Sequence, residues 1–195
     1  MSMKLFILGL LMEKDQHPYE IRQTIKQRNW NISFKLRDGS LYYAVDQLRN
    51  DGLIEAIEVI PVPGDSRPDK TVYRITEQGK AEFMDLMVHQ MEQQSYPQHP
   101  IFAALPFIQY ADARTVEALV EKHLEACACR IERLQTVLDV KRSLLPSGAT
   151  HLIEGMKTFS VAERLWLENL LRDAKSDRLN AGSGIDCQGG SPEPD

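Results

Sequence analysis

The segment from Asp38 to Thr76 constrains the fold more than any other part of this chain. Four of its apolar residues recur at helical spacing and predict a helix with one buried face: Leu41, Ala44, Val45 and Leu48. Asp38 suits the N-cap of that helix, and Gly52 suits the left-handed residue that ends it. Two β-rich runs follow, at 53–62 and 70–75, on either side of a turn-prone loop. A helix followed at once by a β-hairpin predicts the second half of a winged helix-turn-helix.

Helical patterns on both sides complete this unit. A short apolar helix is predicted at 3–12, and a second begins near His17-Pro18, where proline suits the first helical turn. A brief irregular or extended link at 32–36 leads to the third helix. Thr76 is expected to cap a further helix that runs to about Gln94. This order presents a short helix beside a β-ribbon, a shape that fits the major groove of DNA.

A second helical region follows a proline-broken connection at 96–110, for which we expect a packed link or a short helix. Asp112 suits the cap of a long helix that runs to about Leu144. After a turn at 146–148, a last helix is expected from His151 to about Lys175. Two antiparallel helices alone bury little surface, so their apolar faces require the first domain, another chain, or both.

These patterns predict a mainly α fold with a small β-wing, in which a winged helix-turn-helix domain precedes an α-helical dimerisation domain. The winged-helix domain and its following helix are expected at 1–95, and the helical domain at 96–178. The Gly/Ser/Pro/Asp-rich stretch at 179–195 is expected to be a disordered tail.

Charge gives a mixed signal about nucleic acids. The net charge of −5 argues mildly against nonspecific binding of polyanions. Between Glu20 and Asp38, which are the only acids of that segment, lies a basic stripe made of Arg22, Lys26, Arg28, Lys35 and Arg37. Such a stripe suffices to steer a protein onto phosphates, although charge alone would favour a solvated helix face.

The sequence offers no pattern typical of an enzyme, a metal site or a membrane protein. No apolar run approaches the ~20 residues of a membrane span, and the N-terminus lacks a secretion signal, so we expect a cytoplasmic protein with no membrane partner. The three cysteines lack ligand spacing, and Cys127 and Cys129 point in different directions on one helix. The five histidines are scattered, and there is no phosphate-binding glycine loop or nucleophile elbow. We expect no catalysis, no cofactor and no metal.

Several short pieces together resemble the PadR family of bacterial transcriptional regulators. They span about the first 85 residues in the family's order and spacing, and the ordered set is more specific than any single piece. The pieces are Ile7-Leu8-Gly9-Leu10-Leu11, Tyr19-Glu20-Ile21, Gly39-Ser40-Leu41-Tyr42, Leu48 with Gly52-Leu53-Ile54, and Tyr73-Arg74-Ile75-Thr76-Glu77-Gln78-Gly79. The C-terminal half is similar to the family's longer members, whose variable helical domain dimerises. That similarity rests on the helix pattern and the segment 163–167.

The resemblance implies a homodimer that binds double-stranded promoter DNA, as a repressor or an activator, and responds to a small-molecule effector. Of the two we expect a repressor. The dimer would set two reading helices about one DNA turn apart, roughly 34–36 Å, and favour a pseudo-palindromic site. The alternatives are a winged-helix protein–protein adaptor with no DNA role, and a DNA-binding regulator without a ligand.

The matched positions supply candidate DNA contacts. Ser40 and Tyr42 begin the reading helix, where short donors reach phosphates or base edges. Tyr19 matches the family's helix-two tyrosine, which either donates to a phosphate or packs between helices. Tyr43 and Gln47 are better candidates for reading base edges. The candidate phosphate contacts are Lys35 and Arg37 before the helix and, from the wing, Arg67 and Lys70.

Departures from the family put the DNA target and the affinity in question more than the fold. Tyr43 stands where proline is common, Asp46 and Gln47 stand where basic residues are common, and Pro18 replaces a small residue. Asp46 would repel phosphates, although it could accept from a cytosine amine. Trp166 is the candidate effector-binding residue, because aromatic side chains near the family's dimer interface line pockets for flat apolar effectors. Core or dimer packing is the favoured alternative for it.

Overall fold

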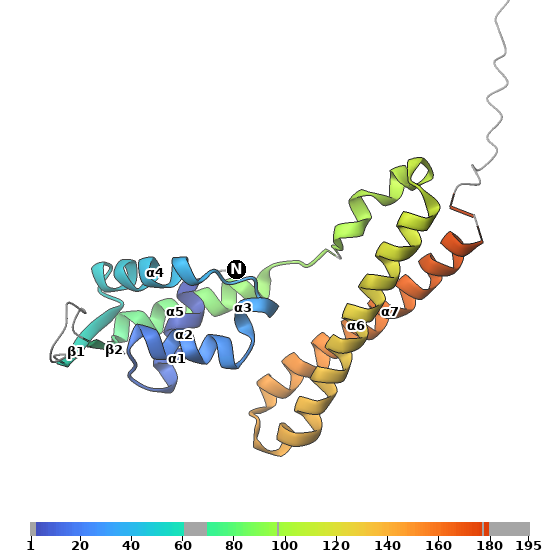
Figure 1. Cartoon of the computed structure of the whole chain (residues 1–195). Coiled ribbons are helices and arrows are strands. Elements are labelled where there is room, and N and C mark those ends of the chain that lie inside the picture. Colours follow the sequence, from blue (N-terminus) through green and yellow to red (C-terminus); the bar gives the residue numbers. More distant parts are fainter. Residues whose placement is uncertain (1–2, 61–69, 97, 177, 180–195) are drawn as a thin grey trace, which may run out of the picture. The chain divides into compact units, whose positions relative to one another are not determined.

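The computed structural model describes residues 3–60, 70–96, 98–176 and 178–179, and it divides into two compact units, Met1–Tyr96 and Pro97–Asp195 (Figure 1). The described residues are mainly helical and contain one two-stranded antiparallel sheet, which lies in the first unit. The mainly α fold with a small β-wing is therefore confirmed. In this part of the chain, no helix is both long and apolar enough to cross a membrane. The expected tail lies outside the described residues from position 180 onward.

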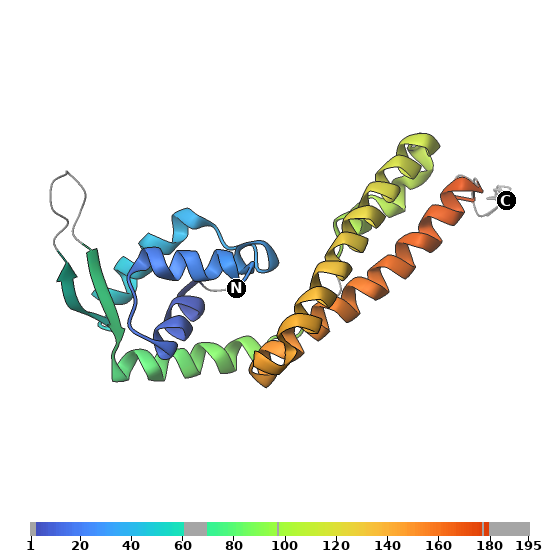
Figure 2. The same cartoon turned by 60° about the horizontal axis from the view of Figure 1, so that its bottom comes forward.

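The first unit is a winged helix-turn-helix built from five helices and two strands. In chain order these are α1 (Met3–Glu13), α2 (Pro18–Gln27), α3 (Trp30–Ser33), α4 (Asp38–Asn50), β1 (Ile54–Ile60), β2 (Lys70–Ile75) and α5 (Glu77–Glu92). Figure 2 shows the β1–β2 hairpin extending from the helices and α5 running away from its base. Both strands and the helix after them lie within a few residues of their predicted positions.

One continuous core holds this unit together. The buried positions of α1 and of the predicted reading helix α4 meet inside it, which is why both helices carry apolar residues at three- and four-residue spacing. Each fully buried leucine or isoleucine contributes about 1.5–3 kcal/mol of transfer free energy. The buried members are Ile7, Leu8, Leu10, Leu11, Ile21, Ile25, Leu41, Ala44, Val45, Leu48, Leu53, Ile54, Tyr73 and Ile75.

The prediction of an irregular link before α4 is wrong in part, because α3 forms a short helix there. Asn29 adopts a left-handed conformation (φ 55°) that separates α2 from α3. One helical turn then brings Trp30 and Phe34 onto the same side, as expected for residues four apart. Both contact Phe6 of α1, with ring centroids 5.3 and 5.0 Å away. Aromatic packing on α1 therefore accounts for a turn that local propensity did not predict.

Helix α4 begins one residue earlier than predicted. Asp38 is its first helical residue, and Arg37 occupies the N-cap position in an extended conformation. Ser40 stabilises the first turn, because its hydroxyl and its backbone N–H both donate to the Arg37 carbonyl oxygen. At the other end Gly52 has φ +72°, the left-handed conformation that the sequence predicted.

The wing is an antiparallel hairpin whose base is fixed to the helices. Ile54 pairs with Ile75 and Ile60 with Lys70, with a register shift between Ala56 and Glu58. A bridge between Gln16 and Tyr73, with backbone hydrogen bonds in both directions, ties the segment after α1 to β2. The predicted loop at 64–69 lies outside the described residues.

Close contacts also join the wing to α5. Thr76 caps α5 by accepting from the Gly79 N–H, as predicted, and donates its hydroxyl to the Gly52 carbonyl. Gly79 lies so close to the wing that a Cβ atom there would meet the Leu53 carbonyl oxygen at 2.0 Å. The helix and the start of β1 can approach this closely only because position 79 carries no side chain.

The second unit is a helical hairpin with two short 3-10 helices before it. These elements are η1 (Pro100–Ala103), η2 (Leu105–Tyr110), α6 (Ala113–Lys141), η3 (Arg142–Leu144) and α7 (Ser147–Lys175). Figures 1 and 2 both show α6 and α7 side by side and running in opposite directions. Asp112 caps α6 as predicted, because its carboxylate accepts the Thr115 N–H at 2.8 Å, and this hydrogen bond lowers the pKa of Asp112.

The predicted turn at 146–148 is wrong, since α7 begins at Ser147 rather than His151. Pro146 is extended and precedes the helix, and its carbonyl accepts the Thr150 N–H at 3.0 Å. Gly148 therefore lies in the first helical turn, where the backbone N–H groups need no partner inside the helix.

A partly buried polar network crosses the seam between α6 and α7. The Cys127 thiol donates to the Ser160 carbonyl oxygen at 3.0 Å, and Arg130 donates to the Ser160 hydroxyl at 2.8 Å. Arg130 also forms an ion pair with Glu163, whose other oxygen lies 3.3 Å from His99 Nε2. Cys127 and Cys129 do not pair with each other, as their spacing predicted.

Candidate nucleic-acid interface

The surface of α4 opposite the core carries the polar residues that the sequence singled out. Leu41, Val45 and Leu48 are buried, which turns the other side of the helix outward. Ser40 is exposed, and Tyr42 and Tyr43 have exposed fractions of 47% and 66%. These phenols are not packed in the core, and because tyrosine is enriched at binding interfaces they are candidates for contacts with a partner.

Two tyrosine–glutamine couples share one geometry on α2 and α4. Gln47 Nε2 donates to the Tyr43 hydroxyl at 2.8 Å, and Gln23 Nε2 donates to the Tyr19 hydroxyl at 2.6 Å. Tyr19 is 49% exposed, so its ring is not enclosed between helices. Gln23 was missed in the sequence, although its four-residue spacing from a tyrosine repeats that of Gln47.

The basic stripe is smaller than the sequence suggested. Arg28 donates two hydrogen bonds to the carboxylate of Glu13, at 2.8 and 2.7 Å, so this cation is neutralised from α1. The same hydrogen bonds lower the pKa of Glu13, against a smaller opposing effect of burial. Glu13 lies outside the segment 20–38, in which Glu20 and Asp38 are the only acids. Lys35 and Arg37 are exposed on either side of the link into α4, and Lys35 has a left-handed backbone (φ 52°).

Asp46 has a cationic neighbour on its own helix. Its carboxylate lies 3.9 Å from the Arg49 guanidinium, and both side chains are more than half exposed. An exposed pair at this distance is weak, but it places a positive charge beside an acid that would repel phosphates. Arg49 was not among the residues that the sequence singled out.

Of the two wing residues that the sequence singled out, the structure describes one. Lys70 is the first residue of β2, where its backbone pairs with Ile60, and Arg67 lies outside the described residues. The hairpin that carries them is anchored at its base by Arg74, which donates to Asp15 with its shortest distance at 2.7 Å. This hydrogen bond raises the pKa of Arg74.

The second unit contains an apolar groove. Its volume is about 490 Å³, and it runs between η1–η2 and the first half of α6, with Thr115 and His123 as its polar lining residues. Trp166 does not line it. Instead this tryptophan packs edge-on against His99 and Phe102, with centroids 5.0 and 5.1 Å away. His99 in turn contacts the ring of His123 at 5.6 Å.

Residues 7–85 match the family described as the transcriptional regulator PadR-like family. The chain is also 38% identical over 81 residues to an uncharacterized protein, X, of Lysinibacillus sphaericus. That match spans 42% of this chain and 71% of the relative.

Solved structures resemble the chain over most of its length. PadR of Bacillus subtilis in complex with operator DNA matches with a TM-score of 0.71 and 20% identity, over 88% of this chain and 98% of that one. The protein smu.1604c of Streptococcus mutans matches with a TM-score of 0.68 and 27% identity, over 88% and 99%. The Bacillus subtilis protein has also been solved in complex with p-coumaric acid, and that structure matches with a TM-score of 0.68 and 19% identity over 88% and 98%.

Proposed function

This chain belongs to the PadR-like family of transcriptional regulators, and from that premise we propose that it is a dimeric repressor. In this proposal the dimer binds a pseudo-palindromic site in promoter DNA and is released from it by a small apolar or aromatic effector. The observation that carries the proposal is the outward face of α4, where Ser40, Tyr42 and Tyr43 are exposed on a helix whose other face is buried in the core.

In the proposed complex α4 enters the major groove. Tyr43 and Gln47 read base edges there, while Ser40 and Tyr42 contact the backbone or bases near the start of the helix. The proposed phosphate contacts are Tyr19, Lys35 and Arg37 beside α4, and Arg67 and Lys70 from the wing. Phosphate contacts fix the register of a protein on the duplex, and base contacts then select the sequence.

Dimerisation is proposed from the open apolar faces of the second unit. Phe159 and Leu165 of α7 are 79% and 60% exposed, and Leu144 before α7 is 80% exposed. Large apolar side chains exposed at several positions of one helical hairpin are the basis for proposing that another surface covers them. A two-fold dimer would place two α4 helices roughly 34–36 Å apart, one DNA turn, which is the reason to expect a pseudo-palindrome.

The proposed effector site is the groove between η1–η2 and α6. A volume of about 490 Å³ suits a small organic molecule, and an apolar lining with few polar groups is typical of such sites. Trp166 contacts His99 and shares a hydrophobic cluster with the groove residue Ile101, so we propose that it responds to the ligand. The effector would shift the population of dimers between DNA-binding and released forms.

Recovery of bound genomic fragments by the purified full-length chain, at near-physiological salt, tests the DNA-binding role. We expect enrichment of one pseudo-palindromic sequence upstream of the regulated gene, and lower transcription from that promoter when the protein is added. Increased transcription would assign an activator instead. A folded dimer that enriches no sequence, with and without small aromatic acids, would favour a winged-helix adaptor, for which the exposed Asp46 and the net charge of −5 are the supporting features.

A further inference from the structure

We propose that Gln23 is a positioning residue that fixes the Tyr19 hydroxyl as an outward hydrogen-bond donor to a DNA phosphate. The inference rests on the proposed function, and it adds a residue that makes no assumed contact with DNA itself. The supporting observation is that the two tyrosine–glutamine couples, on α2 and α4, have the same spacing and the same donor direction.

The chemistry of a phenol makes this direction informative. A tyrosine hydroxyl has one O–H to donate and lone pairs that accept, and its proton turns to suit the partners present. At Tyr19 the lone-pair side is occupied by Gln23 Nε2 at 2.6 Å. Among the described residues, Gln23 is the hydrogen-bond partner of the Tyr19 hydroxyl, so the phenol proton points away from the amide.

A phosphate oxygen is the matching partner, because it accepts hydrogen bonds and donates none. Tyr19 is half exposed near the start of α2, and α2 packs on α4, which we propose as the reading helix. An amide that holds the phenol in its donor orientation before DNA arrives removes the need to order that group on binding. Gln23 therefore acts through Tyr19.

The same arrangement on α4 gives the Tyr43 hydroxyl an outward donor. A donor at a base edge selects acceptors such as guanine N7 and O6 or thymine O4, and it does not suit a cytosine amine. Gln47 retains its amide oxygen and a second N–H, which together match the N6 and N7 edge of adenine. Because Gln47 is itself a proposed base contact, the couple on α2 provides the cleaner test.

The test is a double-mutant cycle on the full-length chain, with binding to a fluorescent mixed-sequence DNA duplex measured over a range of low salt concentrations. Tyr19→Phe removes the donor, and we expect about tenfold weaker binding, since a hydrogen bond to a charged group is lost. The salt slope should not change, because no charge is removed. Gln23→Glu replaces the amide donor by a carboxylate, which accepts the phenol proton and turns the donor inward.

The decisive comparison is the effect of Tyr19→Phe in different backgrounds. In the Gln23→Glu background it should cost less than about twofold, because the donor is already lost. Gln27→Glu is the matched control. Gln27 is also exposed on α2, one turn further along, and glutamate there adds the same charge. Among the described residues, Gln27 has no tyrosine as a side-chain hydrogen-bond partner. In that background Tyr19→Phe should again cost about tenfold.

An equal loss from Tyr19→Phe in the Gln23→Glu and Gln27→Glu backgrounds would overturn the positioning role. Unchanged binding by Tyr19→Phe in the otherwise wild-type chain would overturn the phosphate contact. If the wild-type chain binds no duplex at all, the proposed function fails first, and this inference fails with it. All three positions are exposed, and thermal melting of each variant checks that the fold is kept.

Discussion

The two units of this chain bury apolar side chains in different ways. Among the described residues, the first unit encloses one cluster of fourteen buried hydrophobic residues, whereas the corresponding cluster of the second unit has three, Val120, Leu167 and Leu170. When tyrosines are set aside, Ile32 and Met91 are the large apolar side chains more than half exposed in the described part of the first unit. In the second unit the same holds for Phe107, Leu119, Val140, Leu144, Phe159 and Leu165.

This difference separates a unit that is complete alone from one whose core is open. A winged helix surrounds its core with helices and a hairpin, so its remaining surface is free to be polar and to bind. Two antiparallel helices with only η1 and η2 packed against them lack a full third layer, and their remaining apolar side chains stay in water unless another surface covers them. The comparison predicts that core substitutions unfold the first unit, while surface substitutions alter the assembly of the second.

The largest effect is expected from Gly79→Ala in the complete unit. A Cβ at this position would lie 2.0 Å from the Leu53 carbonyl oxygen and 2.8 Å from the Ile75 side-chain atom Cγ1, and the backbone carbonyl cannot shift cheaply. We expect destabilisation of about 3 kcal/mol or more, at the upper end for overpacked sites, with loss of DNA binding. Urea unfolding followed by circular dichroism measures it.

Gly155→Ala is the matched control in the open unit. Gly155 lies within α7, and a Cβ there would have no neighbour within 4 Å. Alanine favours a helix over glycine by about 0.5–1 kcal/mol, so this variant should be slightly more stable. If Gly79→Ala unfolded at the same urea concentration as wild type, α5 would not approach the wing as closely as described.

The next effect tests whether the open surface of α7 is covered by a second copy. Replacing Phe159 and Leu165 together by glutamate puts two charges on side chains that are 79% and 60% exposed. We expect a folded monomer in sedimentation and binding to its promoter site weaker by about a hundredfold, because the two half-sites are no longer engaged together.

The control for that pair changes one polar position of the same helix. Arg164 is exposed on α7, and Arg164→Glu lowers the net charge by the same two units without altering an apolar side chain. That variant should remain a dimer with nearly unchanged affinity. A Phe159/Leu165 variant that stays dimeric would place the contact elsewhere, with Leu119 and Val140 of α6 as the next surface to change.

The sequence predicted the complete unit better than the open one, for a physical reason. Helix α4, its left-handed Gly52 and strand β2 follow from periodicity and glycine chemistry, and these are local. Helix α3 was missed because it depends on Phe6, which lies far away in the chain. In the second unit, the early start of α7 depends on Pro146 acting as the last extended residue rather than as part of a turn.

The candidate site shows the same division between local and distant information. The exposed side of α4 could be listed from a helical pattern, and Tyr43 and Gln47 do lie four residues apart with a hydrogen bond between them. The neutralisation of Arg28 could not be predicted from its own segment, because Glu13 reaches it from another helix. Trp166 was chosen for its chemistry, and its actual partners His99 and Phe102 come from a connection without helical periodicity.

A smaller effect concerns the Glu13–Arg28 ion pair, which ties α1 to the end of α2 in the complete unit. Hydrogen bonds from Arg28 hold the pKa of Glu13 below its ordinary value of 4.5 in the folded state. As the pH falls below that value the unfolded chain takes up a proton first, so the contribution of the pair is present above 4.5 and is lost at lower pH. Both side chains are partly exposed, which limits the contribution to about 0.5–1 kcal/mol.

Glu13→Gln measures that contribution directly. Urea unfolding should show the variant less stable than wild type near neutral pH, with the two stabilities converging as the pH falls well below 4.5. Glu77→Gln serves as the control, since Glu77 is 89% exposed in its pair with Lys80 and should matter little at any pH. A constant gap between Glu13→Gln and wild type down to low pH would mean that packing, rather than charge, links these helices.

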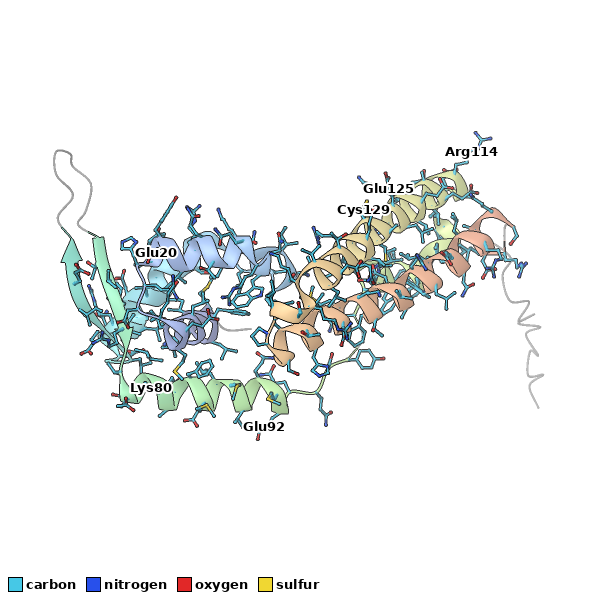
Figure 3. The ribbon with its side chains drawn as sticks, turned by 90° about the horizontal axis from the view of Figure 1, so that it is seen from below. Glu20, Lys80, Glu92, Arg114, Glu125 and Cys129 are labelled. Atoms are coloured by element: carbon cyan, nitrogen blue, oxygen red, sulfur yellow. The ribbon has the colours of Figure 1, made fainter. Side chains whose placement is uncertain are left out.

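The smallest effect tests whether the seam between α6 and α7 is loosely packed, or is well packed with only the outer faces of the second unit uncovered. Cys127 is buried in the seam and donates to the Ser160 carbonyl, and burial, assisted by the negative charge of Glu163, raises the pKa of its thiol. Cys129 is exposed, and Figure 3 shows it on the side of α6 that faces away from α7.

Iodoacetamide requires an accessible thiolate, so Cys129 should react at least about tenfold faster than Cys127. Peptide mapping by mass spectrometry measures the two rates separately. Equal rates without denaturant would show that the seam opens readily, and the second unit would then lack a stable core of its own as well as a cover for its outer faces.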